Sequence, residues 1–134
     1  MSFVFFHIST DSEAGNIMPN MLVRSIRKHY SDIDIIQVTD RKTQAVSGAS
    51  NVYRFDGNSD EIMAYRTNAF SKLGLQKKAI YLDTDMLILK KFNINDIFKN
   101  QDVVLLKRDF MKDAYINTNF RDMDLSYLEG KTIG

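Results

Sequence analysis

The sequence predicts an α/β protein in which a mostly parallel β-sheet is covered by helices on both faces. Continuously apolar segments, as found in strands buried on both sides, alternate along the chain with segments of helical periodicity. The length of 134 residues, of which 44% are hydrophobic, suits one domain with a single core. An aromatic content of 11% and a single proline argue against a disordered or fibrous chain.

The first strand is expected at Phe3–Ile8, a β-rich run that ends in a polar stretch. A helix should follow, because apolar residues then recur at four-residue spacing and form one face. These residues are Met18, Leu22, Ile26 and Tyr30, with Met21 in the same stripe. Pro19 is compatible with this helix, because the first turn needs no amide hydrogen there.

Two further strands are expected at Ile33–Val38 and Asn51–Phe55. A second helix should begin near Ser59 or Asp60, both of which are good N-caps, and end at Gly74. Its apolar positions are Ile62, Tyr65, Ala69, Phe70 and Leu73. The next strand, Lys78–Leu82, runs directly into an acidic tripeptide.

The remainder of the chain is less regular. A short helical stretch is expected near Asp96–Lys99 and a strand at Val103–Leu106, whereas residues 109–134 are polar and weakly periodic. We therefore expect one domain, with an α/β core at residues 1–108 and an incomplete or irregular tail at residues 109–134. The chain is expected to stop within the fold, as if truncated after its first half.

Composition excludes several classes of protein. Without cysteine, the chain has no disulfide, thiol nucleophile or cysteine-based zinc site. Its 18 basic and 17 acidic residues nearly cancel, unlike those of a general nucleic-acid binder. The apolar run Phe3–Phe6 has no basic region before it and is too short for a signal peptide or a membrane span. We therefore expect a cytoplasmic protein with no membrane span and no nucleic-acid partner.

The expected strand ends carry the polar side chains from which a site can be built. In open parallel sheets, ligands bind outside the carboxyl ends of the strands. Those ends are Ser9-Thr10-Asp11, Thr39-Asp40, Asp56 and Asp83-Thr84-Asp85. Such an edge suits a divalent cation and a phosphorylated ligand. Aspartate is also common in turns, and for Asp56 we favour that plainer interpretation.

Asp83 and Asp85 are separated by one residue and directly follow a buried strand. Two unpaired like charges about 5 Å apart repel by about 1–3 kcal/mol at an effective dielectric of 20–80. Mg²⁺ and Mn²⁺ prefer hard oxygen ligands and often take only one or two protein carboxylates, with phosphate oxygens and water in the other positions. The pair therefore indicates a site for Mn²⁺ or Mg²⁺ bound to a diphosphate.

Residues 60–90 resemble the GT-A nucleotide-sugar glycosyltransferases, and most closely glycosyltransferase family 8. In that family a helix of pattern (Y)-R-x-x-x-F/L precedes a strand of pattern h-Y-L-D-x-D-h-h-h, in which h is an apolar residue. Tyr65-Arg66 and Tyr81–Asp85 match these positions. The resemblance implies a Rossmann-like GT-A fold and a single nucleotide-sugar-binding domain.

The resemblance also implies roles for individual residues. Asp83 and Asp85 would bind Mn²⁺ or Mg²⁺, with Asp83 also near the ribose, and Arg66 would steady the diphosphate or the sugar. The loop after the first strand would hold the base and ribose, whereas Asp40 is a candidate only because it ends a strand on the same edge. The complete set of candidates is Ser9, Thr10, Asp11, Asp40, Arg66, Asp83, Thr84 and Asp85.

The sequence departs from the family after residue 90. Family members carry a further metal ligand in a later segment, usually a histidine, whereas this chain has no histidine after His29. Asn117-Thr118-Asn119 loosely resembles the F-N-x-G stretch of the acceptor site but lacks its glycine. The donor half is therefore expected to be present, and the acceptor half to be short or missing.

These features favour a glycosyltransferase that moves a sugar from a nucleotide-diphosphate donor, most plausibly a UDP-sugar, to an acceptor hydroxyl. The sugar, the acceptor and the oligomeric state stay open. The alternative is a non-catalytic nucleotide-sugar-binding fragment or partner subunit. A phosphohydrolase resembling haloacid dehalogenases fits less well: those enzymes place Asp-X-Asp after the first strand and carry Thr or Val where this chain has Leu87.

Two residue types have plainer interpretations. Arg66 could be a helix-surface arginine that pairs with Asp83 merely to neutralise it. His7 is expected to be a strand residue with satisfied hydrogen bonds, and His29 an exposed residue near a helix end; neither is expected to be catalytic.

Overall fold

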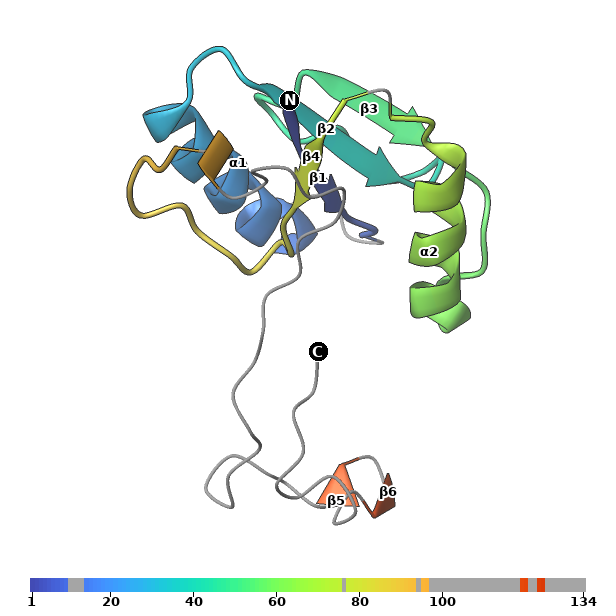
Figure 1. Cartoon of the computed structure of the whole chain (residues 1–134). Coiled ribbons are helices and arrows are strands. Elements are labelled where there is room, and N and C mark those ends of the chain that lie inside the picture. The colour runs from blue at the N-terminus through green and yellow to red at the C-terminus, as the bar shows by residue number, and fades with distance from the viewer. Residues whose placement is uncertain (10–13, 76, 94, 97–118, 121–122, 125–134) are drawn as a thin grey trace. The chain divides into compact units, whose positions relative to one another are not determined.

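The computed structural model describes residues 1–9, 14–75, 77–93, 95–96, 119–120 and 123–124. The chain divides into two compact units, Met1–Lys91 and Phe92–Gly134. The first unit contains a four-stranded sheet and two α-helices (Figure 1). In the second unit, the described residues include two short antiparallel strands, β5 (Asn119–Phe120) and β6 (Met123–Asp124).

All four strands of the sheet in the first unit are parallel. They are β1 (Ser2–Phe6), β2 (Asp34–Thr39), β3 (Asn51–Arg54) and β4 (Ala79–Tyr81), in the order β3-β2-β1-β4. The expectation of an α/β protein with a mostly parallel sheet is thus confirmed for this unit. The strand order is compatible with a Rossmann-like arrangement, in which the chain builds outward on one side of β1 and then returns to the other side.

β1 is an inner strand, and all five of its residues are buried. Successive side chains of a strand point to opposite faces, so Val4 and Phe6 lie on one face, and Phe3 and Phe5 on the other. Burial on both faces favours apolar residues on both sides of a strand, and this accounts for the apolar run from Phe3 to Phe6.

Helix α2 (Ile62–Lys72) covers one face of the sheet, and Figure 1 shows α1 and α2 on opposite sides of it. A single apolar cluster joins this helix to the two inner strands. Its buried members are Val4, Phe6, Ile36, Val38, Tyr65, Ala69 and Leu73. Before the helix lies the 3₁₀ turn η2 (Ser59–Glu61), capped by Asn58 rather than by Ser59 or Asp60. Gly74, at φ 59°, ends the helical segment as expected.

Helix α1 (Ile17–His29) follows the 3₁₀ turn η1 (Ala14–Asn16) and covers the other face. Its buried residues follow the i, i+3, i+4, i+7 spacing: they are Pro19, Leu22, Val23 and Ile26. The expected stripe is therefore wrong in part, because Met18 and Met21 are 59% and 50% exposed. The helix carries more apolar residues than one face of the sheet can cover, and the buried stripe is centred on Leu22 and Val23.

No helix connects β2 to β3; instead, the fully buried side chain of Gln37 holds this loop. Nε2 of Gln37 donates a hydrogen bond to the carbonyl oxygen of Gln44 (3.0 Å), and its Oε1 accepts one from the amide of Val46 (2.7 Å). One buried polar side chain of β2 thus satisfies two backbone groups of the loop beside it.

Several expected elements fall wholly or partly on residues outside the described part. Asn95 and Asp96 are helical, in agreement with the stretch expected near Asp96–Lys99, whose remaining residues are not described. The strand expected at Val103–Leu106 and nearly all of residues 109–134 also lie outside it. None of the described helices has the length and apolar character needed to cross a membrane.

We predict that Gln37→Leu destabilises the fold by about 1–3 kcal/mol, because it leaves a buried amide and a partly buried carbonyl without their partner. Unfolding in urea, followed by circular dichroism, measures the loss. Gln44→Leu is the matched control, since this side chain is exposed and its change should cost less than about 0.5 kcal/mol. Equal losses in the two variants would contradict the role given to Gln37.

Candidate functional site

The candidate site lies at the carboxyl ends of β1 and β4. These strands are neighbours in the register Val4↔Tyr81, and the amide of Leu82 donates to the carbonyl oxygen of Val4 (2.9 Å). The chain leaves β1 toward β2 on one side and later returns to β4 on the other, so the strand order reverses here. In open α/β sheets this reversal opens the crevice in which ligands bind. The tripeptide Asp83-Thr84-Asp85 begins two residues after β4.

Asp83, Tyr81 and Arg66 contact one another at this edge. The hydroxyl of Tyr81 donates to Oδ1 of Asp83 (2.5 Å), and Nη1 of Arg66 donates to that hydroxyl (3.1 Å). Nη1 of Arg66 also lies 3.4 Å from the same Oδ1. The side chain of Asp83 is 48% exposed and that of Arg66 is 27% exposed, so a ligand in solution can reach both.

The ring of Tyr81 is packed on two sides. It makes an edge-to-face contact with Phe70 (centroids 5.2 Å apart, interplanar angle 70°), and the guanidinium carbon of Arg66 lies 5.4 Å from its centroid. Burial raises the pKa of Tyr81 to about 12, and the hydrogen bond to Asp83 adds to the shift. Tyr81 is therefore a neutral hydrogen-bond donor to Asp83 at physiological pH.

Asp85 has different surroundings from Asp83. The amide of Met86 donates to the carbonyl oxygen of Asp83 (3.1 Å), which closes a turn through Thr84 and Asp85. Thr84 and Asp85 line a pocket of about 170 Å³ together with Met18, Met21 and Leu87. Asp85 is exposed, and it thus borders open space between the turn and α1.

Two of the described residues at this edge, Asp83 and Asp85, could hold a cation. Among the described residues, no group of three or more His, Cys, Asp or Glu side chains comes together. Asp83 and Asp85 are hard oxygen donors that solvent can reach, which suits Mg²⁺ or Mn²⁺ when phosphate and water supply the other ligands.

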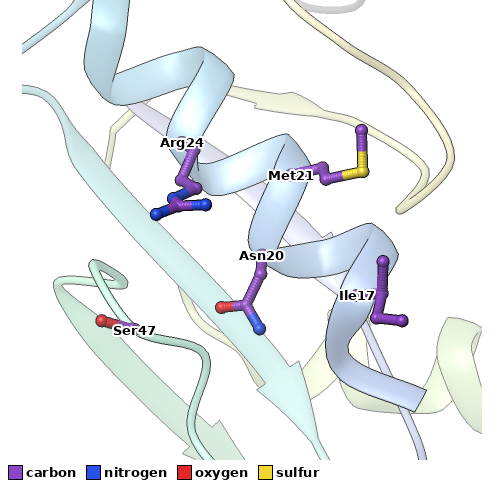
Figure 2. Close-up of a pocket in the computed structure, with 5 residues that line it drawn as sticks. All are labelled: Ile17, Asn20, Met21, Arg24 and Ser47. Atoms are coloured by element: carbon purple, nitrogen blue, oxygen red, sulfur yellow. The ribbon is translucent and has the colours of Figure 1, made fainter. Parts of the chain in front are cut away.

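A second pocket, of about 440 Å³, lies between α1 and the β2–β3 loop (Figure 2). It is lined by Ile17, Asn20, Met21, Arg24 and Ser47. Figure 2 shows Asn20 and Arg24 on the side of the helix that faces Ser47. Met21 borders both pockets, so it separates the second pocket from the edge that carries Asp85.

Of the candidates after β1, the structure describes Ser9 alone, because Thr10 and Asp11 lie outside its described residues. The amide of Ser9 donates to Oγ1 of Thr43 (2.9 Å), which fixes the loop after β1 against the β2–β3 loop. A Cβ atom at Gly15 would lie 1.7 Å from Oγ of Ser9, so the two loop segments approach closely here. Ser9 thus lies at the expected edge in a constrained backbone.

His7 has hydrogen bonds, as expected, but lies one residue after β1 rather than within a strand. His7 is 8% exposed; its Nε2 donates to Oδ1 of Asn16 (2.8 Å), and its carbonyl oxygen accepts from Oγ1 of Thr39 (2.6 Å). It connects the end of β1 to the start of α1. His29 is the last residue of α1 and is partly exposed.

The structure gives Asp40 hydrogen bonds within its own loop. Its Oδ1 accepts from the amides of Thr43 (2.7 Å) and Lys42 (3.0 Å), and Arg54 donates to its carbonyl oxygen (2.7 Å). Burial acts to raise the pKa of Asp40, but the hydrogen bonds from Thr43 and Lys42 and the charge of Arg54 outweigh it, so the pKa is lowered. Asp40 therefore stabilises the loop that holds Ser9.

Asp56 forms a two-pronged ion pair with Arg41. Oδ1 lies 2.6 Å from Nε, and Oδ2 lies 2.8 Å from Nη2, with both side chains exposed. The hydrogen bond from Arg41 lowers the pKa of Asp56. This agrees with the plainer interpretation of Asp56 as a polar turn residue.

The site residue that our sequence reasoning missed is Tyr81. It appears in the family pattern, yet its hydroxyl was not assigned a place in the site. A signal was available, because residues two apart in an extended segment point to the same side and Tyr81 lies two before Asp83.

Comparison with protein-family models, with curated proteins and with solved structures finds no match to the chain. The chain's own residues therefore carry any functional conclusion.

We predict that Asp40→Asn destabilises the protein at pH 7 by about 1–2 kcal/mol, because a charged acceptor of two amides is lost. A carboxyl whose pKa is lowered by folding stabilises the native state above its unfolded value, and this contribution disappears as the pH falls through the folded pKa. The difference between wild type and variant in urea unfolding should therefore shrink below about pH 4. A difference that is constant from pH 7 to pH 3 would contradict this account.

Proposed function

We propose that the protein is a metal-dependent glycosyltransferase of the GT-A type, or the donor-binding part of one, and that its donor is a nucleotide-diphosphate sugar. The observation that carries this proposal is the position of Asp83-Thr84-Asp85 beside β1 at the reversal of the strand order, with Arg66 and Tyr81 against Asp83. The sequence pattern of family 8 and the parallel strand order independently support the same edge.

The charges at this edge suit a cation together with a diphosphate. A diphosphate alone would be repelled by Asp83 and Asp85, whereas a divalent cation would be attracted to both. Arg66 adds a positive charge on the α2 side, and a guanidinium can grip a phosphate through two N–H groups. The edge therefore offers both signs of charge that a metal–diphosphate complex needs.

Within this proposal, each residue has a separate task. Asp83 and Asp85 supply carboxylate oxygens to the cation, and Arg66 orients the diphosphate. A bound divalent cation supplies Lewis-acid stabilisation of the negative charge that builds on the departing diphosphate. The acceptor oxygen bonds to the anomeric carbon as the bond from that carbon to the diphosphate breaks, and the hydroxyl proton passes to a base or to water.

The haloacid-dehalogenase interpretation loses further support from the strand order. In this chain the Asp-X-Asp tripeptide follows β4, the fourth strand in sequence, rather than β1. The residues after β1 that the structure describes, His7 to Ser9, contain no aspartate.

We predict that Mn²⁺ increases the affinity of the protein for UDP and that Asp85→Ala abolishes this increase. Removing a direct ligand should weaken metal-dependent binding by about 100-fold or more, since even residues that only support metal ligands contribute 10–100-fold. Calorimetric titration of UDP, with and without Mn²⁺, measures both effects.

Asp56→Ala is the matched control, because Asp56 also follows a strand and is exposed but pairs with Arg41. Its UDP affinity should equal that of the wild type. If Mn²⁺ leaves the wild-type affinity for UDP unchanged, the proposed function is wrong.

We predict that Arg66→Ala weakens UDP binding by about 10- to 100-fold, the loss expected for charge-assisted hydrogen bonds to phosphate. Circular dichroism should show unchanged helix content, because Arg66 is partly exposed and outside the apolar cluster. Lys28→Ala, an exposed residue in the last turn of α1 that lines neither described pocket, is the control and should bind UDP like the wild type. A large loss of helix in Arg66→Ala would instead make Arg66 a structural residue.

A further inference from the structure

We propose that Tyr81 is the positioning residue of the donor site. Its hydroxyl contacts both Arg66 and Asp83 and, by its short bond to Oδ1 of Asp83, keeps the Arg66–Asp83 ion pair long, so that the guanidinium stays available to an anion and the carboxylate to a cation. This inference rests on the proposed function, because it explains how one site keeps both charges ready for a metal–diphosphate ligand.

The distances give Tyr81 the closer contact with both partners. Its hydroxyl oxygen is 2.5 Å from Oδ1 of Asp83 and 3.1 Å from Nη1 of Arg66, whereas Arg66 and Asp83 approach each other only to 3.4 Å. Charge-assisted N–H···O bonds are normally about 2.7–2.9 Å long. The hydroxyl therefore makes the shortest of these three contacts, with Oδ1 of Asp83, and the direct Arg66–Asp83 contact is the longest.

A second ion pair of the same chain shows the contact of two charges when no hydroxyl of the described residues donates to the carboxylate. Arg41 and Asp56 meet through two bonds of 2.6 and 2.8 Å, and both oxygens of that carboxylate are occupied. In the Asp83 pair, among the described residues, only Oδ1 accepts hydrogen bonds. Oδ2 is thus left for a cation.

The position of the hydroxyl is set by the packing of the ring. Tyr81 contacts Phe70 edge to face, and Phe70 in turn contacts Phe6, whose ring lies 6.3 Å away by centroids in the buried cluster. The guanidinium of Arg66 lies over the Tyr81 ring at 5.4 Å. The ring therefore holds the hydroxyl and the guanidinium together, and it is anchored to the core through two aromatic contacts.

Removal of the Tyr81 hydroxyl alone should let Arg66 form a shorter ion pair with Asp83. Tyr81→Phe keeps the ring, its contact with Phe70 and its contact with the guanidinium. Once closed, the Arg66–Asp83 pair would compete with the cation for the carboxylate. The effect of the substitution should therefore require Arg66.

The test is a double-mutant cycle on binding of Mn²⁺ alone, measured in the full chain by the loss of the electron paramagnetic resonance signal of free Mn²⁺. The four proteins are the wild type, Tyr81→Phe, Arg66→Gln and the double variant. Tyr81→Phe should raise the dissociation constant about five- to tenfold when Arg66 is present, and less than about twofold in the Arg66→Gln background. Tyr53→Phe, an exposed tyrosine on β3, is the matched control and should bind like the wild type.

If Tyr81 only stabilised the fold, the effect of Tyr81→Phe on Mn²⁺ binding would not depend on Arg66. Equal weakening with and without Arg66, or no weakening at all, would overturn the inference while leaving the proposed function intact. If the wild type binds neither Mn²⁺ nor UDP, the proposed function fails and this inference fails with it.

Discussion

The pairing of β4 with β1 is the constraint on which the site depends. Three residues of β4, Ala79 to Tyr81, lie in register with Ser2 to Val4, and Leu82 continues the contact through its amide. β1 is itself buried on both faces and fixed by β2 on its other side. Because β4 pairs with β1, the turn Asp83-Thr84-Asp85 after β4 lies beside the end of β1, where the strand order of the sheet reverses.

The pairing of β4 with β1 also connects the charged residues of the candidate site to the apolar core. Phe70 of α2 contacts both Phe6 of β1 and Tyr81 of β4, so one row of aromatic rings runs from the buried cluster to the edge. Arg66 lies one turn before Phe70 on the same helix and reaches the ring of Tyr81. The polar contacts of Asp83 are thus placed by apolar packing, which is more rigid than a set of exposed ion pairs.

The sequence predicts the parallel strands better than it predicts which helix residues are buried or which polar groups pair. β1 is apolar at every position after Ser2, a pattern typical of a strand covered on both faces. Met18 and Met21 fit the helical periodicity but are exposed. Periodicity alone does not tell which side of an apolar helix packs on the sheet, so their exposure could not be predicted. The hydrogen bonds from backbone amides to Asp40 depend on the conformation of a loop. A loop sequence has no periodicity from which such bonds could be predicted. Tyr81 could have been predicted as a partner of Asp83, because residues two apart in an extended segment have side chains on the same side.

A crystal structure of the full chain with Mn²⁺ and UDP, with manganese located by its anomalous scattering, tests the central claim most directly. The account predicts manganese bonded to carboxylate oxygens of Asp83 or Asp85 and to diphosphate oxygens, with Arg66 turned toward the phosphates. Manganese or UDP bound elsewhere, with Asp83 still held only by Tyr81 and Arg66, would contradict it.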